Sequence, residues 1–243
     1  GSTRRLRSQR RRVEVPSVED AKIVDAENGV AYMRLTSFQK TTSKDVDDAL
    51  WALHRQGMRS LIIDVRNNPG GLLNASVEVA DKFLTRGIIV STRGRSERED
   101  FDYRAHTVGT WRVPVVVMIN GESASASEIF AGAISDHRRG TVVGERSYGK
   151  GSVQGIFPLS RFKSGVRLTT AKFYSPSGRA ISHHGVHPHV AVANEAVSAD
   201  EDAHRVSRPT DTGQFVPPPV TALKVAVETA RRSAQYQARA NGK

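Results

Sequence analysis

The residues with the clearest chemical potential are a serine and a lysine that lie 25 positions apart. Ser125 sits in the small-residue turn GESASASE, and Lys150 stands between glycines in YGKGSVQ. A serine hydroxyl attacks a carbonyl carbon when a neighbouring base accepts its proton, and an uncharged lysine amine is such a base. Flanking glycines let the lysine backbone approach another segment closely. The pair indicates a serine-lysine hydrolase site.

The segment after Ser125 predicts a helix, because residues 128–134 (EIFAGAI) have apolar side chains at helical spacing. The unpaired N–H groups of its first turn are suited to hold a developing oxyanion. The same residues, Ser125 to Glu128, also match a capping box, in which the serine only satisfies a helix N–H group. The serine alone does not decide between a catalytic and a capping role.

The lysine has its own requirement. The ordinary pKa of a lysine side chain is about 10.4, so an amine that works as a base near neutral pH must be removed from water. The flanks 141–144 and 153–157 are apolar and typical of strands. We therefore expect them to surround the Lys150 amine.

Four sequence blocks carry a family resemblance. They are DVRNNPGG (64–71), SASASEIFAGAISD (123–136), VVGERSYGKGSVQ (142–154) and TTAKFYSPSGRAI (169–181). In this order and at these intervals they resemble the signature blocks of the carboxy-terminal processing, or tail-specific, serine peptidases. The resemblance covers residues 29–192, and four blocks in register are far more specific than one motif.

The resemblance implies roles for individual residues. Ser125 matches the nucleophile, Lys150 the general base, and Gln154 the glutamine that orients the amine. Ser123 and Ser127 are alternative nucleophiles in a shifted alignment, and the family interval to the lysine favours Ser125.

The resemblance also implies supporting groups. The backbone N–H groups of Gly71 and Ala126 match the oxyanion hole, and Asp136 matches an aspartate that supports the site without reacting. From the residues alone, Asn-Asn-Pro-Gly-Gly is a sharp strand-to-helix turn that presents bare N–H groups, or an ordinary loop.

The activity implied is a serine endopeptidase that cleaves proteins near their carboxy terminus through an acyl-enzyme intermediate, with polypeptide tails as substrates and no cofactor. The implied location is the cell envelope, periplasmic or otherwise extracytoplasmic. Two other interpretations stay open: a catalytically silent tail-binding or scaffolding protein of the same fold, and acyl-thioester chemistry on a crotonase-like frame.

Hydrophobic periodicity predicts an α/β protein. Strands are expected at 29–38, 61–65, 88–92, 113–119, 153–159 and 165–174, and helices at 42–56, 74–84, after Ser125, and at 220–240. Strands that alternate with helices imply a largely parallel sheet, and the resemblance adds a crotonase/ClpP-like spiral of ββα units with a C-terminal helical arm.

We expect four segments. The first, residues 1–28, is a basic stretch that resembles the connection from a PDZ domain, which is not in this sequence. The second is the protease core at 29–193, and the third is a polar, proline-rich linker at 194–219. The fourth, residues 220–243, holds a C-terminal helix that covers the core or mediates homo-oligomerisation.

Charge is unevenly distributed along the 243 residues. The net charge is +11, and six arginines lie within the first twelve residues. Such a cluster attracts phosphate or an anionic membrane surface. Aromatic residues are only 6% of the chain, so the stacking platform of a single-stranded nucleic-acid binder is not expected. The chain has no cysteine, which excludes disulfides and thiolate metal sites.

Four histidines crowd together at 183, 184, 187 and 189, but no carboxylate stands at ligand spacing, so a metal site is not expected. His189 occupies a position where the family has aspartate, which puts the loop geometry in question. A Ser-His-Asp triad remains open by composition, yet nothing places His106 or His137 better than Lys150.

Overall fold

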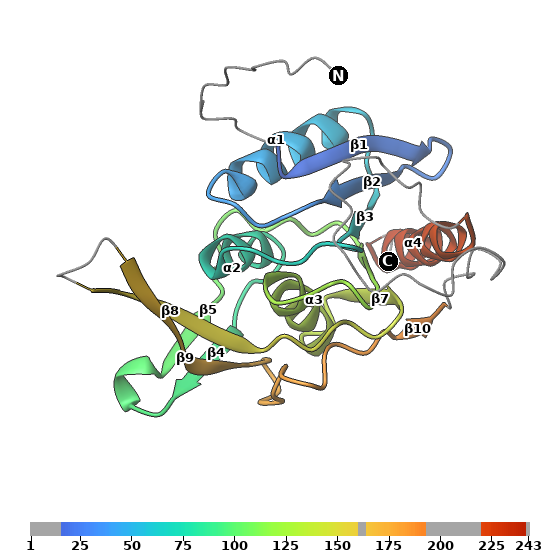
Figure 1. Cartoon of the computed structure of the whole chain (residues 1–243). Helices are drawn as coiled ribbons and strands as arrows, with labels where there is room; N and C mark the ends of the chain where they lie inside the picture. Colours follow the sequence, from blue (N-terminus) through green and yellow to red (C-terminus); the bar gives the residue numbers. More distant parts are fainter. Residues whose placement is uncertain (1–15, 160–163, 193–219, 242–243) are drawn as a thin grey trace, which may run out of the picture.

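The computed structural model describes residues 16–159, 164–192 and 220–241 (Figure 1). Its larger sheet has six strands in the spatial order β1-β2-β3-β6-β7-β10. β1 is antiparallel to β2, and all other neighbours are parallel. The strands are β1 (Val18–Asp25), β2 (Val30–Leu35), β3 (Ser60–Asp64), β6 (Val115–Ile119), β7 (Gly140–Gly144) and β10 (Val190–Ala191). The prediction of an α/β fold with a largely parallel sheet is confirmed.

Helices cover both faces of this sheet. α1 (Thr42–Arg55), α2 (Leu73–Asp81) and α3 (Ala126–Asp136) pack on one face, and α4 (Val220–Asn241) packs on the other (Figure 1). Successive strand residues point to opposite faces, so Met33 joins the core beneath α1 to α3 while Tyr32 joins the cluster beneath α4. Among the described residues, no helix has both the length and the hydropathy to cross a bilayer.

A second, smaller sheet is antiparallel and has the order β5-β4-β9-β8. Its strands are β4 (Ile88–Gly94), β5 (Phe101–Arg104), β8 (Ser152–Leu159) and β9 (Ser164–Tyr174), with a short 3-10 helix η1 (Glu97–Glu99) between β4 and β5. The β8–β9 hairpin projects away from the body (Figure 1), and its apolar side chains, such as Phe157 and Leu168, are exposed. The sequence predicted β8 and β9 but not their assembly into a separate sheet.

One expected boundary needs correction. β1 lies within residues 1–28, which we expected to be a connection outside the core, yet it is the edge strand of the main sheet and pairs with β2. The expected C-terminal helix is α4. The predicted linker at 194–219 and the arginine-rich first twelve residues lie outside the described part of the chain.

The sheet brings two functional turns together. β3 leads into the Asn-Asn-Pro-Gly-Gly turn before α2, and β6 leads into the small-residue turn before α3. β3 and β6 are parallel neighbours, so the two turns emerge side by side at the carboxyl edge of the sheet.

Candidate active site

The turns after β3 and β6 are joined by hydrogen bonds. The backbone carbonyl of Asn68 accepts from the Ala124 N–H at 3.0 Å and from the Ser127 hydroxyl at 2.9 Å. The Asn68 side chain is buried and donates to the Leu35 carbonyl at 2.8 Å. These contacts hold the glycine pair of one turn against the serine of the other.

Glycine is required where the turns meet. A Cβ atom on Gly70 would lie 2.8 Å from the Ala126 nitrogen and 2.9 Å from the Ser125 Cβ. Gly71 has φ of +144°, and a Cβ there would lie 2.0 Å from the Phe38 carbonyl oxygen. In the described part of the chain, the N–H groups of Gly71 and Ala126 have no acceptor. Two unpaired backbone donors therefore lie on segments that meet at Ser125.

Ser125 differs from the serines on either side. Ser123 and Ser127 are fully buried, and their hydroxyls donate to the carbonyls of Val65 and Asn68. Ser125 is partly exposed and has φ of 55° and ψ of −112° immediately before α3. Such a backbone conformation costs on the order of 1–3 kcal/mol and is typical of functional positions. Of the three serines, Ser125 is the one available to a substrate.

Glu128, which the sequence analysis considered only as a cap, connects the serine and lysine segments. Its carboxylate is fully buried and accepts four hydrogen bonds. One oxygen, Oε2, accepts from the N–H groups of Ser125 and Lys150, both at 2.8 Å. The other, Oε1, accepts from the Ser147 hydroxyl at 2.5 Å and the Gly149 N–H at 2.6 Å. A glutamate directly before the apolar run 129–134 was the available signal.

The Lys150 backbone is held closely, as its flanking glycines predicted. A Cβ on Gly151 would lie 2.2 Å from the Ser182 nitrogen, and the Gly149 carbonyl accepts from the His183 N–H at 2.9 Å. The side chain of Lys150 is nevertheless exposed, so the burial that we expected is wrong for this conformation.

The expected partners of the lysine are also apart in this conformation. Gln154 lies on β8 with its side chain exposed, because the flank 153–157 belongs to the projecting hairpin and does not cover Lys150. Within the described residues, no hydrogen bond joins the Lys150 amine to Ser125 or to Gln154.

Asp136 lies at the opposite end of α3 from Ser125, about 16 Å along a helix with a rise of 1.5 Å per residue. Its carboxylate binds Arg179 at 2.6 Å and the Ser177 N–H at 3.0 Å. Burial alone raises the pKa of Asp136, but hydrogen bonds from Ser175, Ser177 and Arg179 outweigh it and lower the pKa. Asp136 therefore fastens α3 to the turn after β9 and has no direct contact with Ser125.

A second polar network lies on the face of the sheet that α4 covers. The buried Tyr32 hydroxyl donates to Asp64 at 2.8 Å, and Arg66 donates to both Asp64 oxygens. Burial, the Asp64 charge and the hydrogen bond to Asp64 raise the pKa of Tyr32. This network supports the end of β3, where the Asn-Asn-Pro-Gly-Gly turn begins.

Three of the histidines considered above make structural contacts. His106 binds Asp81 at 2.9 Å on the surface, and His137 contacts the Ile88 carbonyl at 2.6 Å. His189 accepts from the Val142 N–H at 2.9 Å, so it pairs with β7. Among the described residues, no group of three or more potential ligands has a geometry that could hold a metal ion.

Comparison with known proteins places this chain in a family. The model of peptidase family S41 matches residues 29–192. A carboxy-terminal-processing protease of Bartonella bacilliformis is 44% identical over 172 residues, which cover 68% of this chain and 39% of the relative. A carboxyl-terminal-processing protease of Synechocystis is 39% identical over 172 residues, covering 71% of this chain and 40% of the relative.

A solved structure gives the same result. The photosystem II D1 C-terminal processing protease superposes with a TM-score of 0.63 at 37% identity, covering 70% of this chain and 44% of that one. The chain thus spans about two fifths of the length of these relatives. From the four sequence blocks, the two apposed turns and these matches, we conclude that the chain belongs to peptidase family S41.

Proposed function

We propose that this chain is the core of a serine endopeptidase that cleaves proteins near their carboxy terminus. The observation that carries the proposal is the meeting of Ser125, in a strained conformation before α3, with the unpaired N–H groups of Gly71 and Ala126. Preorganised donors of this kind stabilise the oxyanion of an acyl-transfer reaction. The names of the relatives, which are carboxy-terminal processing proteases, support the substrate class.

In the proposed reaction the neutral Lys150 amine accepts the Ser125 proton as the hydroxyl oxygen attacks the scissile carbonyl. The tetrahedral oxyanion lies between the Gly71 and Ala126 N–H groups. Its collapse breaks the C–N bond, the protonated lysine donates its proton to the leaving amine, and an acyl-enzyme remains. Water then attacks the ester with the same lysine as base, and Gln154 orients the amine.

The exposed lysine indicates a resting arrangement. Its backbone is already tied to the Ser125 segment through Glu128, so the reaction requires the Lys150 side chain to turn towards Ser125 and Gln154 to approach the amine. β8 begins two residues after Lys150 and is an edge strand, so an extended substrate can add to it by main-chain pairing. We propose that the bound peptide excludes water from the amine and so creates the base.

The exposed lysine also favours one other candidate, a tail-binding protein of the same fold that does not hydrolyse its ligand. Such a protein would hold peptides without consuming them. By analogy with the family, either activity operates in the cell envelope.

Serine-directed labelling separates the two candidates. The protein is treated with a fluorophosphonate, and the adduct is located by mass spectrometry of peptides. We expect modification at Ser125 in the unaltered protein, none in Ser125→Ala and a strong reduction in Lys150→Ala. Ser43→Ala and Lys44→Ala, both on α1, are the matched controls and should label normally. Binding of tail peptides without labelling or turnover would refute the peptidase and support the binder.

A further inference from the structure

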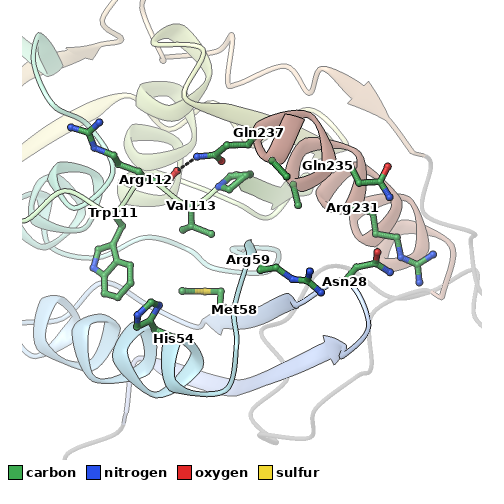
Figure 2. A pocket seen from close by; sticks show the side chains of 13 residues that line it. Asn28, His54, Met58, Arg59, Trp111, Arg112, Val113, Arg231, Gln235 and Gln237 are labelled. Atoms are coloured by element: carbon green, nitrogen blue, oxygen red, sulfur yellow. Dashed lines mark hydrogen bonds between the residues drawn. The ribbon is translucent and has the colours of Figure 1, made fainter. Parts of the chain in front are cut away.

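Two adjoining cavities lie at the end of the molecule opposite Ser125. One has a volume of about 440 Å³ and the other about 820 Å³, and both are lined by Arg112, Pro114 and Gln237. The first lies between the residues before β3 and β6 and the C-terminal half of α4 (Figure 2). The second lies where β6 and β7 begin, against the same half of α4. The cavities form one depression on the face that points away from the two catalytic turns.

The lining of both cavities is cationic and includes no carboxylate. Arg112 and Arg138 are exposed and have no ion pair in the described part of the chain. Arg139 donates only to neutral backbone carbonyls, so its charge is not compensated. The cationic lining residues are Arg59, Arg112, Arg138, Arg139, Arg231 and Arg232. Arg231 is paired with Asp25 and Arg232 with Glu228, so Arg112, Arg138 and Arg139 carry the argument for an anionic ligand.

The first cavity also has an apolar floor, and aromatic side chains flank the depression. The floor is formed by Met58, Val113, Pro114, Ala234 and Ala238. Trp51 is 55% exposed beside Trp111, and Tyr236, in the second cavity, is 78% exposed. Tryptophan and tyrosine combine an apolar ring with a polar group, which suits them to the boundary between water and lipid.

An apolar floor with a cationic rim matches an anionic amphiphile. We propose that this end of the sheet is a docking surface for anionic phospholipid headgroups, with the aromatic side chains at the level of the membrane interface. A nucleic acid fits less well, because it has no apolar tail to cover the apolar floor of the first cavity. Docking here leaves the Ser125 edge open to solvent and to protein substrates.

The chain contains its own probe for this proposal. It has two tryptophans, Trp51 and Trp111, and both lie at the proposed surface. Their emission is recorded while vesicles of phosphatidylcholine, with or without phosphatidylglycerol, are added, and sedimentation gives the bound fraction. We expect a blue shift and cosedimentation with the anionic vesicles alone, both weakened by salt.

A double variant tests the surface itself. One arginine near an anionic membrane contributes about 1 kcal/mol, so Arg112→Gln with Arg138→Gln should weaken binding about thirtyfold. Arg95→Gln with Arg98→Gln removes the same charge from the exposed connection between β4 and β5 and should bind as the unaltered protein does. Circular dichroism checks that both variants are folded.

Several results would overturn the proposal. Equally weakened vesicle binding in both double variants would show that binding depends on net charge and not on this surface. Sedimentation without an emission shift would place the contact elsewhere, for example at the arginine-rich first twelve residues. The same emission shift with inorganic phosphate alone would indicate a site for small anions and not a membrane surface. Because none of these readouts uses peptide cleavage, the result is independent of the proposed activity.

Discussion

Replacement of Glu128 by glutamine is the sharpest test of how the structure holds the proposed nucleophile Ser125 and the proposed base Lys150 together. The carboxylate accepts four hydrogen bonds, two on each oxygen. A glutamine has one oxygen and an NH₂ group, so two of the four donors would face another donor. Glu128→Gln preserves the volume of the side chain and so tests the hydrogen bonds without opening a cavity.

The magnitude follows from the number of orphaned donors. Each unsatisfied buried donor costs about 1–3 kcal/mol, and because the Ser125 and Lys150 segments are only partly buried we expect a total loss of about 2–4 kcal/mol. For a chain of this size that corresponds to a fall in Tm of roughly 4–16 °C. Displacement of the lysine segment by about 1 Å should also lower kcat about 100-fold, with a smaller change in KM.

The assay combines urea unfolding with cleavage of a tail peptide at a temperature where the variant is folded. Glu122→Gln is the matched control, because Glu122 is exposed and lies three residues before Ser125. It should behave as the unaltered protein does in both measurements. If Glu128→Gln lost no more stability or kcat than this control, the inferred bridge between the two segments would be refuted.

Three further changes test separate parts of the structure. Gly71→Ala introduces a Cβ that would lie 2.0 Å from the Phe38 carbonyl oxygen. We expect a stability loss of at least about 2 kcal/mol by urea unfolding, together with loss of cleavage. Normal activity would exclude the N–H group of residue 71 from the oxyanion hole. Asp136 has a lowered pKa in the folded state, so its contribution to the free energy of unfolding is present above about pH 4 and is lost as the pH falls through the lowered pKa. Asp136→Asn should therefore be less stable than the unaltered protein at neutral pH by chemical unfolding, and the difference should narrow in acid. A difference in stability that does not depend on pH would contradict this. Tyr32→Phe removes a 2.8 Å hydrogen bond to Asp64 and should cost about 1–2 kcal/mol in the same assay, whereas no loss would show that Arg66 alone satisfies the carboxylate.

Much of the fold could be predicted from local patterns of apolar residues in the sequence. The core strand β6 is a continuous apolar run, β3 has three apolar residues in a row at its centre, and α1 has its buried residues Val46, Leu50 and Leu53 at helical spacing. A strand that is buried on both faces has consecutive apolar residues, and a helix that is buried along one side has apolar residues at helical spacing. Both patterns can therefore be recognised in the sequence. The elements that the sequence analysis missed, β1, β5 and β10, are short or largely exposed edge strands, which exist because a neighbour pairs with them.

The residue types and intervals by themselves indicated the candidate nucleophile, the glycine turn and the lysine. The family blocks implied their roles. The glycine positions were informative because a residue without a Cβ is typical of a sharp turn or of a close approach to another segment, although the sequence does not say which segment. A Cβ on Gly70 or Gly71 meets backbone atoms, which cannot move aside.

Tertiary structure alone decided which polar groups are enclosed. It buried Ser123 and Ser127 while leaving Ser125 accessible, and it enclosed the Glu128 carboxylate among four donors. It also left Lys150 in solvent, because the strand expected to cover it joins a projecting hairpin. Burial and hydrogen-bond partnership depend on segments distant in the chain, so residue order alone does not determine them.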